Sequence, residues 1–226
     1  MFDCTTAWEH RVFMRDHREG GALAAAAARC VRDVLGAASL SDASGAETRV
    51  DEYFPLDARR GLKCRGGSSS SADDAFELKT VTARDEASGT ELLEKVVLVR
   101  TPRAWEGAPL SPETCAALDA ALLAPAVPVT KRRRAASTTN DTLRAEVVEL
   151  QVPHATPRWL TVCVEGSDGR RVAAAGGAVL SELRSSTPSL AEDIILVGSY
   201  AAWLCRVVAG RTPSASHASV TKRPSA

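Results

Sequence analysis

Charged side chains recur two or four positions apart in a series of short β-favouring runs, and this spacing has the clearest chemical consequence in the sequence. Side chains alternate between the two faces of a strand, so charges spaced in this way share one face. The residues between them are apolar, as Leu62 and Cys64 are beside Lys63. The charged pairs are Glu9 and Arg11, Arg49 and Asp51, Lys63 and Arg65, Glu77 and Lys79, Glu91 and Lys95, Lys131 and Arg133, and Arg144 and Glu146, with Glu165 at the end of a further run.

Two architectures accommodate such strands. In a sandwich the charged faces meet water, whereas in a closed barrel covered by helices they line a charged lumen. A lumen rich in Lys and Arg suits a polyphosphate, because the cations donate charge-assisted hydrogen bonds to phosphate oxygens. A few carboxylates among them suit a divalent metal that bridges the phosphates and polarises the reacting phosphorus.

Eight strands and several helices are expected to position these charges. Helix 22–38 follows from apolar residues at helical spacing, and helix 111–123 from Ser111 as N-cap with Pro112 at the first helical position. Helices are also expected at 176–186, although Gly176 and Gly177 favour a turn, and within 189–208. The strands are expected at 7–14, 47–54, 61–65, 75–83, 91–100, 127–134, 142–152 and 158–165.

These elements predict an α+β fold, an eight-stranded antiparallel β-barrel (tunnel) with flanking α-helices. Residues 1–210 form the predicted tunnel domain, and the polar, low-complexity residues 211–226 are expected to be a disordered tail. No apolar stretch approaches the roughly 20 residues that span a bilayer, so no membrane association is expected. The first residues lack the features of a secretory signal, which makes a cytoplasmic location the default.

Composition and spacing argue against nucleic-acid binding and against cysteine-based chemistry. The 28 Lys and Arg residues balance the 28 Asp and Glu residues, and only 4% of the chain is aromatic, which argues against nucleic-acid binding by the run Lys131-Arg132-Arg133-Arg134. In a strand, moreover, Lys131 and Arg133 face one way and Arg132 and Arg134 the other. The six cysteines form no C-x-x-C pair, so they are interpreted as reduced thiols.

The order of these motifs resembles the CYTH-like, or triphosphate tunnel metalloenzyme, superfamily, from Ala7 to about Val208. Gly61 to Arg65 resembles its L-R-x-R strand, Phe76 to Lys79 its L-x-x-K strand, and Pro128 to Arg133 its V-x-K-x-R strand. The helix motif S-Y-x-x-x-L is similar to Ser199 to Leu204. The remaining matches are Ala7 to Arg11 with E-x-E-x-K, Gly89 to Lys95 with an acidic strand, and Val162 to Glu165 with the paired E-x-E of the metal site.

The resemblance implies a metal-dependent hydrolase of a triphosphate or related phosphorylated ligand, with Mg²⁺ or Mn²⁺ as cofactor. It implies metal binding by Glu9 and Glu165, and a place for Arg11 beside the phosphate that is cleaved. Glu91 or Glu146 would assist metal binding or orient water. The implied phosphate-binding residues are Lys63, Arg65, Lys79, Lys131, Arg133 and Arg144.

A second hypothesis belongs to a different class. Ala7 and Cys163 stand where the family has carboxylates, so the barrel is alternatively a binding or scaffolding protein that has lost its metal chemistry. The choices between Glu91 and Glu94, and between Glu146 and Glu149, also stay open, because a β-bulge shifts a strand's faces by one residue. The organic part of the ligand and the oligomeric state are left open.

Overall fold

The computed structural model describes residues 3–17, 21–36, 46–65, 75–99, 105, 107–138, 142–153, 158–188 and 193–209. Within these residues the chain forms nine strands and four helices, in the order β1 (Asp3–Asp16), α1 (Ala22–Leu35), β2 (Glu47–Pro55), β3 (Arg60–Arg65), β4 (Ala75–Asp85), β5 (Thr90–Val99), α2 (Pro112–Leu122), β6 (Val127–Ser137), β7 (Leu143–Gln151), β8 (Arg158–Gly166), α3 (Gly169–Ser186), β9 (Ile194–Val197) and α4 (Tyr200–Ala209).

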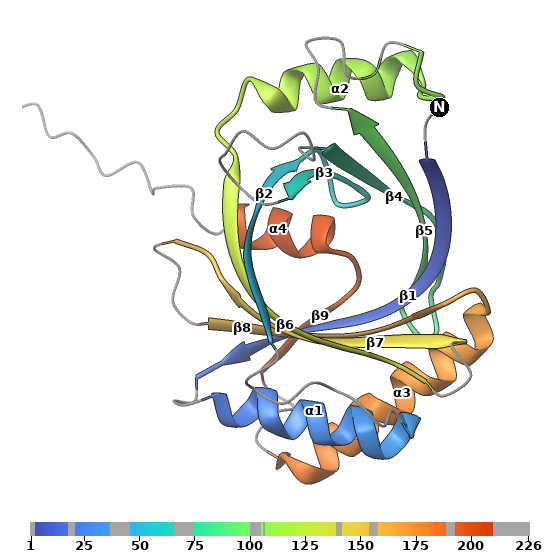
Figure 1. The fold of residues 1–226 in the computed structure, drawn as a ribbon, viewed down its shortest axis with the longest axis vertical. Coiled ribbons are helices and arrows are strands. Elements are labelled where there is room, and N and C mark those ends of the chain that lie inside the picture. The colour runs from blue at the N-terminus through green and yellow to red at the C-terminus, as the bar shows by residue number, and fades with distance from the viewer. Residues whose placement is uncertain are drawn as a thin grey trace, which may run out of the picture.

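The first eight strands close into an antiparallel barrel, as the sequence predicts. Neighbouring strands follow the order β5-β4-β3-β2-β6-β7-β8-β1. The long strand β1 closes the ring, because Trp8–Asp16 pairs with β8 while Asp3–Glu9 pairs with β5. Figure 1 shows this ring of strands in a view into the barrel.

Helices cover the outside of the barrel on two sides. Helices α1 and α3 pack against β1, β7 and β8, where alanines of α1 and Val172, Val179 and Leu183 of α3 are buried. Helix α2 packs its buried Leu118 on Leu62 and Leu78 at the opposite side (Figure 1). No described helix is long and apolar enough to cross a membrane.

The C-terminal part of the chain differs from the prediction of one helical stretch over 189–208. Residues Ile194–Val197 form the short strand β9, which pairs with Val12–Met14 of β1, and α4 begins only at Tyr200. Strand β5 pairs with β1 only as far as Glu9, so beyond that point the backbone groups on this edge of β1 need another partner. The run Ile-Ile-Leu-Val is rich in β-branched residues and supplies the partner.

Helix α3 also differs from its prediction. It begins at Gly169, where the carboxylate of Asp168 accepts hydrogen bonds from the backbone N–H groups of Arg170 and Arg171. The pair Gly176-Gly177 therefore lies inside the helix, and its interpretation as a turn is wrong. A Cβ atom at position 176 would lie 2.3 Å from the ring of His10, so glycine is needed for the close approach of α3 to β1. The tail 211–226 and position 210 lie outside the described residues.

Candidate functional site

The inward-facing side chains of the barrel divide into a charged part and an apolar part along the same strands. In β1, Glu9 and Arg11 precede Phe13, and in β8 the reverse order leads from Trp159 to Glu165. The antiparallel register puts Glu9 opposite Glu165 and Phe13 opposite Thr161, so like segments meet at the same level. The inward-facing side chains of β2, β6 and β7 also change from charged to apolar along the strand. Asp51 is followed by Tyr53 in β2, Lys131 is preceded by Val129 in β6, and Glu146 is followed by Val148 and Leu150 in β7.

The apolar part forms a closed end that we name the aromatic floor, consisting of Phe13, Tyr53, Trp159, Tyr200 and Trp203. Helix α4 supplies Tyr200 and Trp203 and lies within the outline of the barrel (Figure 1). The rings of Phe13 and Trp203 stack with centroids 5.1 Å apart, and Trp159 meets Trp203 edge-on at 5.7 Å. Phe13 and Trp203 have no solvent exposure, so the floor is tightly packed.

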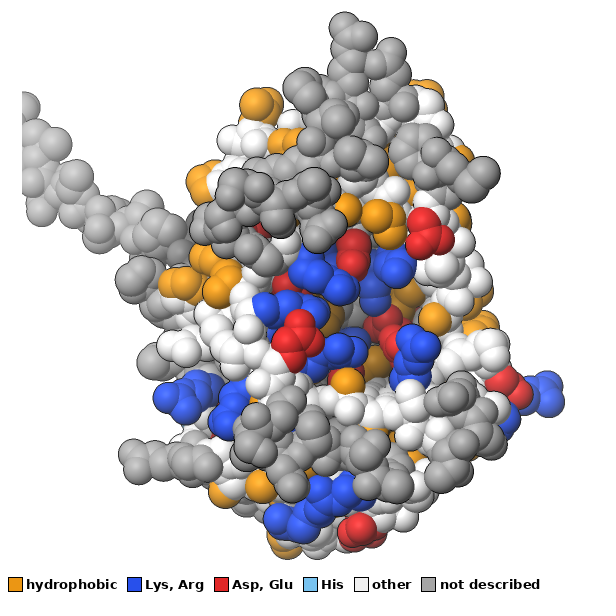
Figure 2. Space-filling model, viewed as in Figure 1, with side chains coloured by type: hydrophobic (Ala, Val, Ile, Leu, Met, Phe, Trp, Pro, Cys, Tyr) orange, Lys and Arg blue, Asp and Glu red, His pale blue; other side chains and the backbone are white. Residues whose placement is uncertain are grey.

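The charged part surrounds a hollow of about 280 Å³ that we name the charged cavity. Figure 2 shows its basic and acidic side chains gathered at the centre of this face of the molecule. Four glutamates line it, namely Glu9, Glu77, Glu146 and Glu165. Ten cations line it as well, namely Arg11, Arg49, Arg59, Lys63, Arg65, Lys79, Lys95, Lys131, Arg133 and Arg144.

Arg11 occupies the centre of the ion-pair network in this cavity. Its Nη2 atom lies 3.3 Å from Glu9 Oε2 and 2.8 Å from Glu146 Oε1. Glu146 also accepts a hydrogen bond of 2.7 Å from Nε of Arg133, and Glu9 pairs with Lys79. A second pair of cations, Lys63 at 2.7 Å and Arg65 at 2.9 Å, holds Glu77. These carboxylates are thus already neutralised by cations.

The charge state of the buried glutamates follows from these partners. Burial favours the neutral form of Glu9, but Lys79 and Arg11 outweigh it and hold the pKa of Glu9 below its ordinary value. Arg11 and Arg133 likewise outweigh burial at Glu146 and lower the pKa of that carboxyl strongly. Both groups are therefore ionised at neutral pH.

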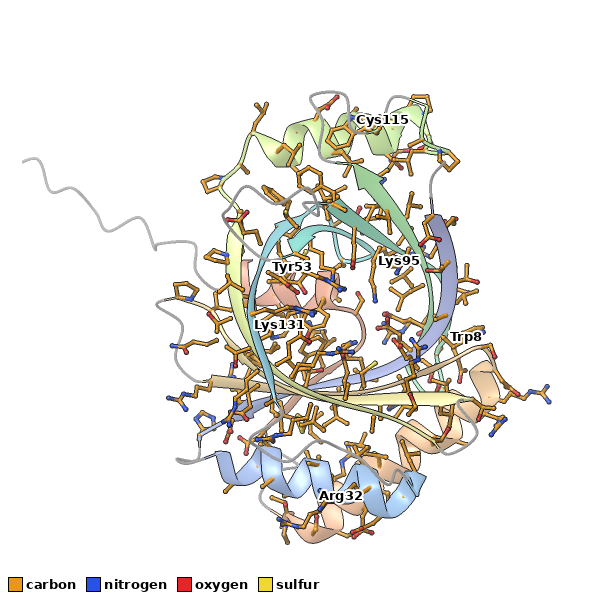
Figure 3. All side chains as sticks on the ribbon, viewed as in Figure 1. Trp8, Arg32, Tyr53, Lys95, Cys115 and Lys131 are labelled. Carbon is orange, nitrogen blue, oxygen red and sulfur yellow. The ribbon has the colours of Figure 1, made fainter. Side chains whose placement is uncertain are left out.

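Lys131 lies where the charged cavity meets the aromatic floor. Its Nζ atom is 3.0 Å from Asp51 Oδ2, donates to the hydroxyl of Tyr53, and lies 4.0 Å from the ring centroid of Tyr200. Figure 3 shows Tyr53, Lys131 and Lys95 inside the barrel. Burial outweighs the attraction of Asp51 and lowers the pKa of Lys131 from 10.5 to about 7. This lysine therefore changes charge near neutral pH.

The structure brings together nearly all of the residues that the sequence proposed as a site. Every predicted phosphate-binding residue lines the charged cavity, as do Glu9, Arg11, Glu146 and Glu165. Glu146 faces inward and Glu149 outward, where Glu149 pairs with Arg134 at 3.3 Å. Lys131 and Arg133 likewise face the cavity, whereas Arg132 lies on the outer face, as strand alternation predicts.

Glu91 is the exception among the predicted site residues. It stands opposite Glu9 in the sheet and thus faces inward, but it is not among the residues that line the cavity. Its carboxylate is buried, 2.9 Å from Nη1 of Arg84, and burial raises its pKa. The segment around Gly198 and Ser199 lies beside this carboxylate, and Glu91 is outside the residues that line the cavity. Its role in assisting metal binding or orienting water stays a prediction.

Several residues of the cavity were not predicted from the sequence. Tyr53 and Tyr200 belong to it, and the pattern of charged pairs gave no signal for an aromatic residue at the end of a charged run. Arg59 lines it from the turn before β3, where strand alternation makes no prediction. Lys95 and Arg49 were visible as charged positions but not as members of a common site.

The donor set does not fit a divalent metal held by the protein. Glu9 and Glu146 already bind Arg11, and the thiol of the intervening Cys163 lies 3.9 Å from Glu9 Oε2. Burial raises the pKa of Cys163 well above its ordinary value, so this thiol is protonated and is a poor ligand for Mg²⁺ or Mn²⁺. Among the described residues, no three His, Cys, Asp or Glu side chains group as metal ligands do.

No family model and no curated protein matches this chain. The resemblance to the CYTH-like superfamily therefore rests on the motifs of the sequence and stays a prediction.

Proposed function

We propose that the protein binds a small phosphorylated polyanion inside the barrel, through cationic side chains and without a metal held by the protein. The observation that carries this proposal is the imbalance of charge in the cavity. Ten cations and four glutamates line it, although the chain as a whole has no net charge. Asp51 and Glu47 pair with three of these cations from beside the cavity, and positive charge is still in excess. An anion with several charges compensates this excess better than a single carboxylate does.

The shape of the cavity supports the same ligand class. Its cations come from strands on all sides of the barrel, so a ligand within it meets positive charge around its whole circumference. A phosphate chain presents acceptor oxygens in all directions and satisfies such a wall. The low exposure of Arg11 and Lys131, 3% and 4%, means that these contacts form away from water, where they are stronger.

The test is isothermal titration calorimetry with tripolyphosphate in the presence of EDTA. The chain provides a matched pair of variants, since Arg133 faces the cavity and its neighbour Arg132 faces outward. Arg133→Ala is expected to weaken binding by about tenfold or more, and Arg132→Ala by less than about twofold. Thermal unfolding of both variants shows whether a loss of binding reflects a loss of folding.

Metal-dependent hydrolysis is the alternative that the same samples address. Phosphate release from tripolyphosphate and ATP is measured with Mg²⁺ or Mn²⁺, in the wild type and in Lys63→Ala and Glu165→Gln. Turnover that both substitutions abolish would favour a metal-dependent hydrolase over a binding protein. Absence of binding in EDTA, or equal effects of the two arginine variants, would contradict the proposed function.

A further inference from the structure

Lys131 lies at the inner end of the charged cavity, in surroundings that differ from those of Lys63 and Lys79. Its side chain is 5% exposed, against 11% for Lys63 and 31% for Lys79. The rings of Tyr53 and Tyr200 take the place of water beside it, with centroids 4.9 Å and 4.0 Å from its Nζ atom. Such enclosure favours the neutral amine, which is a nucleophile, over the hydrated ammonium ion.

The carboxylate beside Lys131 is shared with a second cation. Asp51 Oδ2 lies 3.0 Å from Lys131 Nζ, while Asp51 Oδ1 lies 3.0 Å from Nε of Arg49. Arginine stays charged at neutral pH, so Asp51 keeps a cationic partner when the amine is neutral. Lys63 of β3 adds repulsion to a protonated Lys131. The amine can therefore lose its proton without leaving a buried carboxylate unpaired.

The hydroxyl of Tyr53 completes the group around Lys131. It lies within hydrogen-bonding distance of Nζ, and burial raises the pKa of this phenol well above its ordinary value, so the phenol holds its proton. A neutral amine accepts that proton in a hydrogen bond, and the same hydroxyl can carry a proton to a neighbouring oxygen. A nucleophilic amine, a proton carrier and a carboxylate are thus brought together.

The other end of the cavity continues into an open groove of about 500 Å³, lined by the last part of β6 and the first part of β7. The groove shares Arg133, Arg144, Glu146 and Glu165 with the cavity, so the two spaces are continuous. Its further lining consists of small or hydroxyl-bearing residues, namely Ala135, Ala136, Ser137, Thr138 and Ala145. A small molecule that enters by this route passes Arg133 before it reaches Lys131, two residues away on the same face of β6.

From these features we infer that Lys131 binds an anionic carbonyl compound covalently, by forming an imine (Schiff base) with an aldehyde or ketone that carries a phosphate group. The inference rests on the proposed function for recognition of that phosphate, and adds a covalent step that cationic binding does not include. Side chains two residues apart on one strand face are separated by about 7 Å. A short carbon chain between the two groups therefore places the phosphate at Arg133 when the carbonyl carbon is at Lys131.

The reaction needs no oxidant or reductant. The nitrogen lone pair of Lys131 forms a bond to the carbonyl carbon, and one proton of the nitrogen moves to the carbonyl oxygen through the Tyr53 hydroxyl. The C–O bond then breaks, and the oxygen takes one proton from solvent and leaves as water. The product is a protonated imine, whose positive charge lies beside Asp51 and the ring face of Tyr200.

Reductive trapping tests the inference. The protein is incubated with glyceraldehyde 3-phosphate and sodium cyanoborohydride, which reduces an imine to a stable secondary amine, and the adducts are located by peptide mass spectrometry. The main adduct is expected at Lys131, and glyceraldehyde without the phosphate should give at least about tenfold less of it. Absence of an adduct at Lys131, or equal adducts at Lys63, Lys79 and Lys131, would overturn the inference.

Tripolyphosphate separates this inference from the proposed function. An excess of tripolyphosphate should suppress the Lys131 adduct, because both ligands use the same cations. If calorimetry in EDTA shows that tripolyphosphate binds but no adduct forms, the covalent step is wrong and the proposed function stands. If tripolyphosphate neither binds nor suppresses the adduct, the proposed function is wrong, and with it the recognition of the phosphate group.

A pH series distinguishes the enclosed amine from an ordinary lysine, with Nα-acetyllysine in the same solution as the reference. Enclosure lowers the pKa of Lys131 from 10.5 to about 7, so its excess reactivity over the reference should shrink by up to about tenfold per pH unit above pH 7. An excess that stays constant above pH 7 would contradict a neutral amine at Lys131. The charged or titratable groups that face Lys131 are Arg49, Asp51 and Tyr53 of β2, Lys63 of β3, Glu146 of β7 and Tyr200 of α4.

Three variants complete the test. Lys131→Arg keeps a positive charge but removes the nucleophile and should lose the adduct, whereas Arg132→Ala, at the outward-facing neighbour, should form it as the wild type does. Tyr53→Phe keeps the ring and should slow adduct formation by about tenfold or more. An undiminished total of adducts in Lys131→Arg would overturn the inference, and an unchanged rate in Tyr53→Phe would contradict the role of its hydroxyl. If a variant does not fold, the location of the adduct in the wild type still decides the question.

Discussion

The charged cavity and the aromatic floor are two halves of one barrel interior, built from the same strands, and they contribute opposite properties. In the floor, Phe13 and Trp203 bury large apolar rings, which removes nonpolar surface from water and stabilises the fold. In the cavity, Asp51 and Lys131 are buried as an ion pair, whose attraction is largely offset by the loss of hydration.

The difference shows how a small barrel stays folded although it buries charged side chains in half of its interior. The four glutamates that line the cavity stand among ten cations. Asp51 and Glu47 neutralise part of the difference through Arg49, Lys131 and Arg133, and the remaining excess is positive and is compensated when an anion binds. The closed end supplies the packing that an interior composed only of charges would lack. Ligand binding is therefore expected to stabilise the folded state as well as to occupy the site.

The largest effect is expected in the floor. Trp203→Ala removes the ring that contacts Phe13 and Trp159, and should lower the free energy of unfolding by about 3–5 kcal/mol. Urea unfolding followed by circular dichroism measures this value. Leu123→Ala, at a side chain that is 90% exposed, is the control and should change stability by less than about 0.5 kcal/mol. Similar losses in both variants would show that the floor is not the stabilising half.

The next effect is expected where helix α3 packs on the outer face of β1, the strand that carries Glu9 and Arg11. Gly176→Ala places a methyl group against the ring of His10 and should cost about 1–3 kcal/mol of stability. Gly177→Ala is the matched control, because a Cβ atom there has no neighbour within 4 Å, and it should stabilise by about 0.5–1 kcal/mol. Opposite signs for adjacent glycines in thermal unfolding would verify the close packing of α3 on β1.

A pH dependence is expected from the charged half. Lys131 has a pKa of about 7 when folded and an ordinary value of 10.5, so the unfolded chain binds more protons between these values. Its contribution to stability therefore rises with pH across that window. Anion binding favours the protonated amine, and tripolyphosphate affinity should fall by up to about tenfold per pH unit above pH 7.

Lys131→Arg isolates this effect, because arginine stays charged throughout. The groups that face Lys131, namely Asp51, Lys63, Tyr53, Tyr200 and Glu146, are unchanged in the variant. The ionisation of tripolyphosphate is also common to both proteins. Calorimetry from pH 6 to pH 9 covers the titration of Lys131, whose pKa is about 7. The difference in tripolyphosphate affinity between wild type and variant should grow with pH in this range. A constant difference would exclude Lys131 as the titrating group.

The smallest effect is expected where the cavity meets the groove. Glu165→Gln removes a negative charge beside Arg144, its partner in the register of β7 and β8, and should tighten tripolyphosphate binding by about two- to fivefold, or ~0.4–1 kcal/mol. The gain should shrink at high salt, because the groove is open to solvent. A loss of affinity would contradict a site that works by cations alone and would favour a role for Glu165 at a metal.

Strand alternation was sufficient to predict much of this molecule from its sequence. The pairs Lys63 and Arg65, and Lys131 and Arg133, share a face because they are two residues apart in extended backbone, and that holds in any sheet. The strand β9 was not predicted, because a four-residue apolar run beside a helical segment has no distinctive period. The helical position of Gly176 was also missed, since it depends on contact with His10.

The sequence by itself determined which side chains share a strand face, because that depends only on the local backbone. The tertiary structure decided that those faces turn inward, that α4 closes one end, and that Arg11 stands between Glu9 and Glu146 where a metal would need free carboxylates. These features depend on contacts between residues far apart in the chain, such as Phe13 with Trp203. Local spacing carries no information about such contacts.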